Sequence, residues 1–230
     1  MLTAARLESL TDVADADRLI DGLGRSGLPL SLTQRVRLAS SPSCCAALAL
    51  RRLAEITFGP TRLSRRLTRS LLSRQQPDGS WESDPLATAC AVAALQRIVA
   101  EHRADDAPRL AMRRGEWALA SMQRPDGLLV GTADREEDAA ASMGALILYL
   151  LDRVDTAWEA VRRTDLAACV QSRVHRLAEA ERLLLEMAIP AGESGERRRP
   201  EASVAGGDRH ETGVVAMPPR MEPVVSTVAA

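Results

Sequence analysis

The sequence predicts an all-α protein built from repeated pairs of helices. Three stretches, at residues 44–50, 86–95 and 139–151, are apolar almost all round and recur with a period of roughly 48 residues. The segments between them carry leucines at helical spacing with arginines in the other positions. Alternating Val, Ile and Thr runs, which are typical of strands, occur only near the end of the chain. Because a helix without a polar face must be enclosed by others, the pattern predicts apolar inner helices paired with amphipathic outer ones.

Each inner helix has a start signal. Residues 41–45 read SPSCC and residues 84–88 read DPLAT, so Ser41 and Asp84 each stand before a proline at the first helical position. Before the third apolar run, Asp134 and Glu137 have the spacing of a capping box. These signals predict three inner helices with defined beginnings.

The outer helices are predicted at residues 61–75 and 109–123, and the first 30 residues are also helix-like. Residues 155–189 show a long helical pattern that is consistent with one helix or with two and ends at Pro190. The chain thus offers about seven helices in a domain over residues 1–189. Residues 190–230 are rich in Gly, Pro, Ser and charge, and we predict a disordered tail there because little apolar surface is available to offset the entropy of ordering.

A turn motif is repeated between the helices. Residues 73–81 read SRQQPDGSW and residues 121–129 read SMQRPDGLL. Proline presets φ, aspartate bonds to its own following backbone and glycine supplies a positive φ. The glutamine stands in the last helical turn, where its amide can reach free carbonyls. We therefore predict a structural role, stapling consecutive helices, for Gln75, Asp78, Gly79 and Trp81 and for Gln123, Asp126 and Gly127.

Composition excludes several classes of chemistry. The formal charge is −1 over 230 residues, so no global field attracts nucleic acid or an acidic membrane. All 30 cationic side chains are arginine, which excludes a lysine nucleophile or Schiff base. The apolar runs are shorter than the roughly 20 residues of a membrane span, so no transmembrane segment is expected. Four cysteines without C-x-x-C spacing indicate buried free thiols and predict a cytoplasmic location.

Residues 66–81 resemble the QW motif of the prenyltransferase and squalene-oxidase repeat superfamily. The matching positions are Arg66, Leu71, Gln75, Gly79 and Trp81, and in the second copy Arg114, Gly115, Leu119, Gln123 and Gly127. Ser70 and Ala118 replace the usual aromatic residue, and Leu129 replaces the second tryptophan. Over residues 40–152 the resemblance implies an α/α toroid, here a partial one because the family's closed ring uses about twelve helices.

Within the resemblance, class II terpene cyclases use a protonated carboxylic acid in a D-x-D-D motif at the start of an inner helix. The nearest pattern is DREED at residues 134–138, with Asp134, Glu136, Glu137 and Asp138 as candidate catalytic acids. The other interpretation is that these residues cap the helix and complement its dipole.

Candidate substrate-binding residues are the arginines Arg113, Arg114 and Arg135, which would hold a diphosphate, and Tyr149, the only aromatic residue on an inner helix. Trp117 is expected to pack against a neighbouring helix. No Asp, Cys and His set suggests zinc, and His102, His175 and His210 lie far apart. We expect no cofactor, with Mg²⁺ entering only as the companion of a diphosphate substrate.

The resemblance implies a terpene-cyclase-like or prenyltransferase-like protein of isoprenoid metabolism, either an acid-initiated cyclase or a cyclase component that binds an isoprenoid or another hydrophobic small molecule. The alternative is a non-catalytic helical-repeat subunit that binds a partner protein or a lipid. Seven helices would leave an inner wall open, and we expect a second copy, a larger cyclase partner or a ligand to cover it.

Overall fold

The computed structural model describes residues 28–56, 61–101, 106–131, 137–152 and 154–189. Within these ranges the chain forms nine α-helices and no strand, which confirms the all-α prediction. The number is higher than the seven expected, because a helix precedes the first apolar run and because the last segment is divided. The predicted amino-terminal helix and the predicted tail lie outside the described residues.

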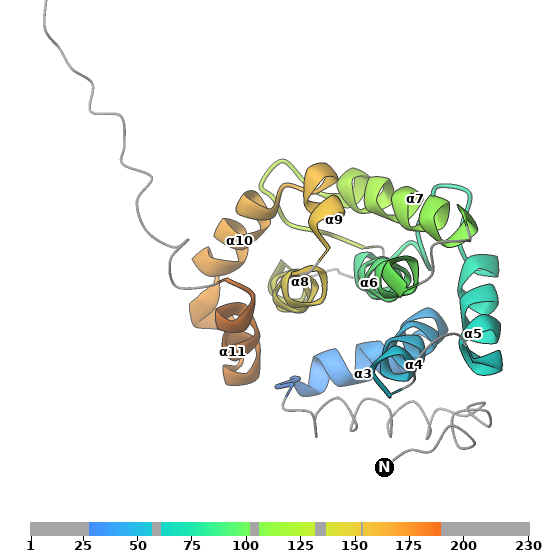
Figure 1. The fold of residues 1–230 in the computed structure, drawn as a ribbon. Helices are drawn as coiled ribbons and strands as arrows, with labels where there is room; N and C mark the ends of the chain where they lie inside the picture. The colour runs from blue at the N-terminus through green and yellow to red at the C-terminus, as the bar shows by residue number, and fades with distance from the viewer. Residues whose placement is uncertain (1–27, 57–60, 102–105, 132–136, 153, 190–230) are drawn as a thin grey trace, which may run out of the picture. The chain divides into compact units, whose positions relative to one another are not determined.

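The three apolar runs form neighbouring helices, α4 (Pro42–Ile56), α6 (Pro85–Glu101) and α8 (Glu137–Leu151). α6 contacts both α4 and α8, and Figure 1 shows α6 and α8 at the centre of the view with α4 below α6. The start signals of α4 and α6 act as expected, and Asp134 of the third signal lies outside the described residues. Ser41 Oγ accepts a hydrogen bond from the Cys44 backbone N–H at 3.0 Å, and Asp84 Oδ1 accepts one from that of Leu86 at 2.7 Å.

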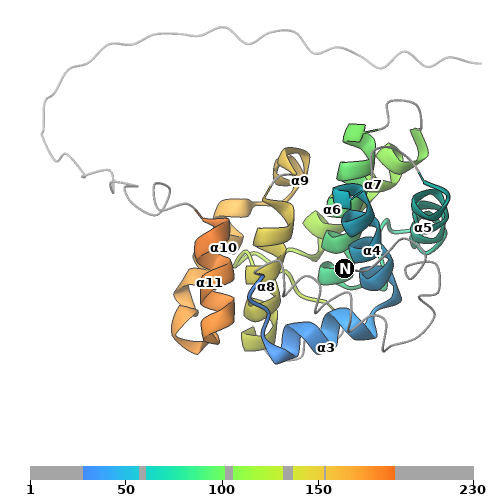
Figure 2. The ribbon, with the colours of Figure 1, turned by 60° about the horizontal axis from the view of Figure 1, so that its bottom comes forward.

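The amphipathic segments form an outer layer. α5 (Arg62–Ser73) packs on α4, α7 (Asp106–Met122) packs on α6, and α10 (Arg163–Ser172) packs on α8. Figure 2 shows α5 and α7 on the side of the described domain opposite to α10 and α11 (Glu179–Ala188). Two further helices belong to this layer. α3 (Leu32–Ser40) contacts α4 and α8, and the short α9 (Asp155–Ala160) contacts α7.

The prediction of one or two helices over residues 155–189 was wrong. The segment contains α9, α10, a single 3₁₀ turn at Val174–Arg176, and α11. The chain is extended at Val161, with φ −93° and ψ 132°, and again at Leu177, with φ −77° and ψ 143°. Of the periodic apolar residues that suggested continuity, those of α10 and α11 in the core are Leu166, Val170 and Leu184, whereas Val174 and Met187 are exposed.

The core also contains a polar connection between α3, α8 and α11. Gln34 Nε2 donates to the Ser142 backbone carbonyl at 2.9 Å, and Ser142 Oγ donates to Glu181 Oε1 at 2.5 Å. All three side chains are buried, so each needs the partner it has. Among the described residues, no helix is both long and apolar enough to cross a membrane.

Candidate functional site

The first turn motif joins α5, α6 and α7. Gln75 Nε2 donates to the backbone carbonyls of Gly79 at 2.9 Å and of Ala111 in α7 at 2.7 Å. Trp81 is fully buried, and its indole N–H donates to the Leu71 carbonyl of α5 at 2.8 Å. The glutamine therefore ties the turn to the following outer helix, while the tryptophan closes the junction with the preceding one.

In the second turn motif the glutamine again bonds the turn glycine and a residue of the following outer segment. Gln123 Nε2 donates to the carbonyls of Gly127 at 2.9 Å and of Arg162 at 3.0 Å, and its Oε1 accepts from the Arg162 backbone N–H at 2.9 Å. Because Arg162 is the residue before α10, this side chain bonds both backbone groups at the break between α9 and α10. Leu129, which takes the place of Trp81, is also fully buried.

Both glycines of the motif are required by geometry. Gly79 has φ +89° and Gly127 has φ +93°. A Cβ at Gly79 would lie 2.5 Å from the carbonyl oxygen of Arg114, and one at Gly127 would lie 2.5 Å from that of Asp165. Each turn thus sits directly on the backbone of the next outer helix. The contacts of the turn residues are therefore structural, and candidate binding residues must be sought elsewhere in the molecule.

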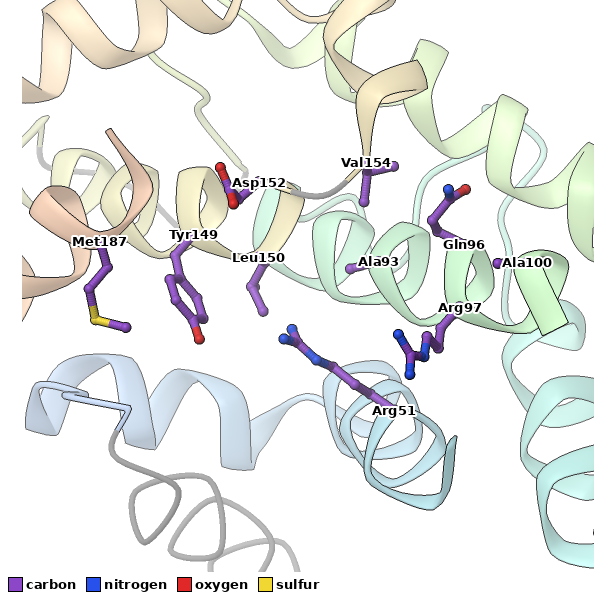
Figure 3. Close-up of a pocket in the computed structure, with 10 residues that line it drawn as sticks. All are labelled: Arg51, Ala93, Gln96, Arg97, Ala100, Tyr149, Leu150, Asp152, Val154 and Met187. Atoms are coloured by element: carbon purple, nitrogen blue, oxygen red, sulfur yellow. The ribbon is translucent and has the colours of Figure 1, made fainter. Parts of the chain in front are cut away.

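A pocket of about 570 Å³ opens at the carboxyl-terminal ends of the inner helices. Figure 3 shows Arg51 from α4 and Arg97 from α6 extending into one space, with Tyr149 and Leu150 of α8 beside it. Met187 of α11 lines the same pocket; the other lining residues are Ala93, Gln96, Ala100, Asp152 and Val154. The pocket therefore combines two guanidinium groups with an apolar and aromatic wall.

Asp152 is the one carboxylate among the described lining residues, and it is not placed as an acid catalyst. Its side chain is 40% exposed and forms an ion pair with Arg163 at 3.2 Å. An acid that protonates an alkene needs burial or like-charged neighbours to hold its proton near neutral pH. Asp152 is partly exposed and has an arginine as its charged neighbour. One carboxylate also does not build a magnesium site, and the described residues contain no group of three metal-binding side chains.

The acidic cluster predicted to be catalytic lies at the other end of α8. Glu137 and Asp138 are exposed, and their carboxylates pair with the arginines Arg124 and Arg173, and Arg176, respectively. Asp134, Arg135 and Glu136 lie outside the described residues. Neither Glu137 nor Asp138 lines the pocket, so the structure does not bring them together with Tyr149.

The predicted arginines of α7 also lie apart from the pocket. Arg113 pairs with Glu116 at 3.3 Å and with Glu159 at 3.6 Å. Arg114 is exposed on the same outer helix, where its backbone supports Gly79. Trp117 was expected to pack against a neighbouring helix, and this was wrong, because it is 73% exposed. Tyr149 is the predicted binding residue that does line the pocket.

Sequence reasoning missed Arg51 and Arg97, although a signal for them exists. Both are charged residues in the second half of helices whose first half is almost wholly apolar. Such a residue either leaves the helix bundle or faces a polar space inside it. The order of the helices in space, which the pattern does not show, decides that both reach the same pocket.

Cys44 is not placed as a nucleophile. Cys44 and Cys90 are buried free thiols of α4 and α6. A hydrogen bond with Cys90 and burial raise the pKa of the Cys44 thiol well above its ordinary value. The thiol therefore stays protonated at neutral pH, and a protonated thiol is a poor nucleophile.

No family model, curated protein or solved structure matches this chain.

Proposed function

We propose that this chain is a terpene-cyclase-like repeat protein of isoprenoid metabolism that binds an isoprenoid with an anionic head group in the pocket between α4, α6 and α8. The proposal includes a partial α/α toroid as the scaffold, which is supported by the alternation of inner and outer helices and by the two QW-like turns. The observation that carries the function is the pairing of Arg51 and Arg97 with Tyr149, Leu150 and Met187 around one space.

The lining suits a ligand with two chemically different ends. Guanidinium groups form paired, charge-assisted hydrogen bonds with phosphate oxygens, so Arg51 and Arg97 suit a diphosphate. Leu150 and Met187 offer the apolar contact that an isoprenoid chain requires, and a flexible methionine adapts to irregular chains. The volume of about 570 Å³ lies within the range of small-molecule sites. We expect Mg²⁺ only as a counterion that the diphosphate brings.

The role proposed for the pocket is binding, with the chain acting as a component of a cyclase and not as the source of its acid. This follows from the ion-paired state of Asp152 and from the distance in the fold between the pocket and the start of α8. Acid-initiated cyclisation through Asp134, Glu136, Glu137 and Asp138 is the alternative that the experiment must separate.

The test is calorimetric titration of the full chain with a prenyl diphosphate, the corresponding prenyl alcohol and inorganic diphosphate. We expect the prenyl diphosphate to bind most tightly, because it alone uses both ends of the pocket. Arg97→Gln should weaken it by roughly 10- to 100-fold, the usual range for one lost hydrogen bond to a charged group. Arg182→Gln, which removes an exposed arginine of α11, is the matched control and should change little.

Product analysis of the same incubations separates the alternative. Glu137→Gln and Asp138→Asn should leave binding unchanged. Turnover by the unmodified chain that disappears in these two variants would establish the acid-initiated cyclase instead. Equal affinity for the prenyl diphosphate in Arg97→Gln and the unmodified chain would remove the pocket from the proposal.

A further inference from the structure

The outer face of α5 concentrates positive charge. Arg62, Arg65, Arg66 and Arg69 are all exposed, and Arg62 and Arg69 each stand three and four residues from the adjacent pair Arg65 and Arg66, so the four form one stripe along the helix, the arginine stripe. Residues 61–77 contain no acidic residue. None of the four arginines forms an ion pair with an acidic side chain among the described residues.

This arrangement has a cost for the isolated helix. Like charges three or four residues apart on a helix repel each other. Arg62 also stands in the first turn, where the helix dipole disfavours a cation. An external anionic surface would relieve both effects. The overall charge of −1 conceals this local excess, because the compensating acids lie elsewhere in the chain.

The neighbouring outer helix carries exposed apolar side chains. Leu110 is 63% and Trp117 is 73% exposed, and they stand seven residues apart on α7, with the exposed Arg113 and Arg114 between them. We name Leu110 and Trp117 the apolar ridge. The end of α5 joins this region directly, since Gln75 bonds Ala111 and Gly79 lies on Arg114. Figures 1 and 2 both show α5 and α7 as neighbours.

We propose that the arginine stripe and the apolar ridge together bind the surface of a membrane that contains anionic phospholipids. Phosphate head groups complement the four arginines, and a bilayer also accepts the aromatic and aliphatic side chains of the ridge at its interface. Nucleic acid would satisfy the arginines and would leave Leu110 without an apolar partner. The inference is independent of the pocket and of its ligand.

The experiment uses the full chain and vesicles of phosphatidylcholine with or without phosphatidylglycerol at low salt. We expect flotation with the anionic vesicles alone, and its loss as salt is raised. Trp117 supplies a built-in depth probe, because Trp81 is fully buried and Trp158 is half-buried. Its emission should shift to shorter wavelength on binding and should be quenched by brominated lipid.

Two matched variants separate a specific surface from general charge. Arg65→Gln with Arg69→Gln should weaken binding by roughly 30-fold, since each basic residue near an anionic surface contributes about fivefold. Arg176→Gln with Arg182→Gln removes the same charge from exposed positions near α11 and should change binding little. Trp117→Phe should keep most of the binding and lose the emission shift.

Any of three results would overturn the proposal. These are no flotation with anionic vesicles, an equal loss of binding in the two double variants, and binding without a shift or quenching of the Trp117 emission. Tighter binding to duplex DNA or single-stranded RNA than to the vesicles would assign the arginine stripe to nucleic acid instead.

Discussion

The two turn motifs share the hydrogen bonds within the turn and differ in the apolar side chains that fill the junction. In the first copy Trp81 lies against Gly115, where a Cβ would come within 2.8 Å of the indole ring. In the second copy Leu129 replaces the tryptophan, and Leu166 stands where the first copy has Gly115. Gly115 and Leu166 each come directly after the residue whose carbonyl lies against the turn glycine. That residue is Arg114 in the first copy and Asp165 in the second.

The exchange extends to the inner helices. Val92 of α6 faces Gly115. In the second copy Gly144 of α8 faces Leu166, whose side chain would lie 3.4 Å from a Cβ at Gly144. In each copy a large side chain lies opposite a small one. The small residue stands on the outer helix in the first copy and on the inner helix in the second. The repeat thus keeps the hydrogen bonds within the turn, while a large and a small residue can exchange places in the junction, because close packing requires that they complement each other.

The largest expected effect comes from emptying the first junction. Trp81→Ala should lower the free energy of unfolding by about 4 kcal/mol, because it removes a fully buried ring and the hydrogen bond to the Leu71 carbonyl. Urea denaturation followed by circular dichroism measures it. Leu129→Ala is the parallel change and should cost about 3 kcal/mol. A loss below 1 kcal/mol for Trp81→Ala would show that the ring does not hold the junction.

Converting the first junction into the second tests the exchange itself. Gly115→Leu alone should destabilise by about 3 kcal/mol, because the new side chain meets Trp81 and Val92. Combined with Trp81→Leu, the total loss should be smaller than the sum of the two single losses by about 2 kcal/mol, as a double-mutant cycle would measure. Compensation stays partial because Val92 also occupies the space. Strict additivity would contradict the exchange of volumes.

The turn glycines should be equally sensitive in both copies. Gly79→Ala and Gly127→Ala each place a Cβ against a backbone carbonyl in a left-handed conformation, which should cost about 3 kcal/mol. Thermal unfolding of the two variants gives the comparison. A large loss of stability in only one of the two variants would mean that the two turns do not contribute equally to the stability of the fold.

The glutamines should differ. Gln75→Ala should cost about 2 kcal/mol and Gln123→Ala about 1 kcal/mol, because the bond from Gln75 to Ala111 is partly buried whereas the bonds from Gln123 to Arg162 are exposed. Gln75→Glu is a second disruptive variant, since it keeps the shape but replaces the N–H donor by a charged acceptor. If Gln123→Ala causes the larger loss of stability, the bonds from Gln123 to Arg162 stabilise the fold more than their exposure predicts.

The smallest effect concerns pH. The Ser80 backbone N–H and then its hydroxyl donate to Asp78, and these bonds lower the pKa of the carboxyl below its ordinary value of 3.8. A folded-state pKa below the unfolded one adds stability above the unfolded pKa, and this is lost as pH falls through the folded value. Asp78→Asn should therefore reduce the loss of stability below about pH 4. Chemical denaturation between pH 3 and 6 would detect it, with Asp126→Asn as the variant of the other copy. An unchanged profile would remove Asp78 from this role.

How far the sequence predicts the fold can be seen at particular residues. Ser41 and Asp84 were recognisable as helix caps because capping is a local matter of a side chain and the next three backbone N–H groups. The turn residues were recognisable for the same reason. The breaks at Val161 and Leu177 were not, because an apolar residue every three or four positions reports burial and not the continuity of the helix.

The candidate site divides in the same way. Tyr149 was singled out as the aromatic residue of an inner helix, and it lines the pocket. Arg51 and Arg97 are 46 positions apart, and only the packing of α4 against α6 brings them to one space. Trp117 is exposed for a comparable reason, since no element of the described chain covers that face of α7.

By itself the sequence determined the helical class, the starts of two inner helices and the composition of both turns, because each depends on interactions between residues a few positions apart. The tertiary structure alone decided which carbonyls Gln75 and Gln123 reach and which side chains share the pocket. It also decided that the large side chain of the junction is Trp81 in the first copy and that Leu166 helps to fill the same place in the second. These depend on contacts between helices distant in the chain, where the fit of whole surfaces sets the outcome.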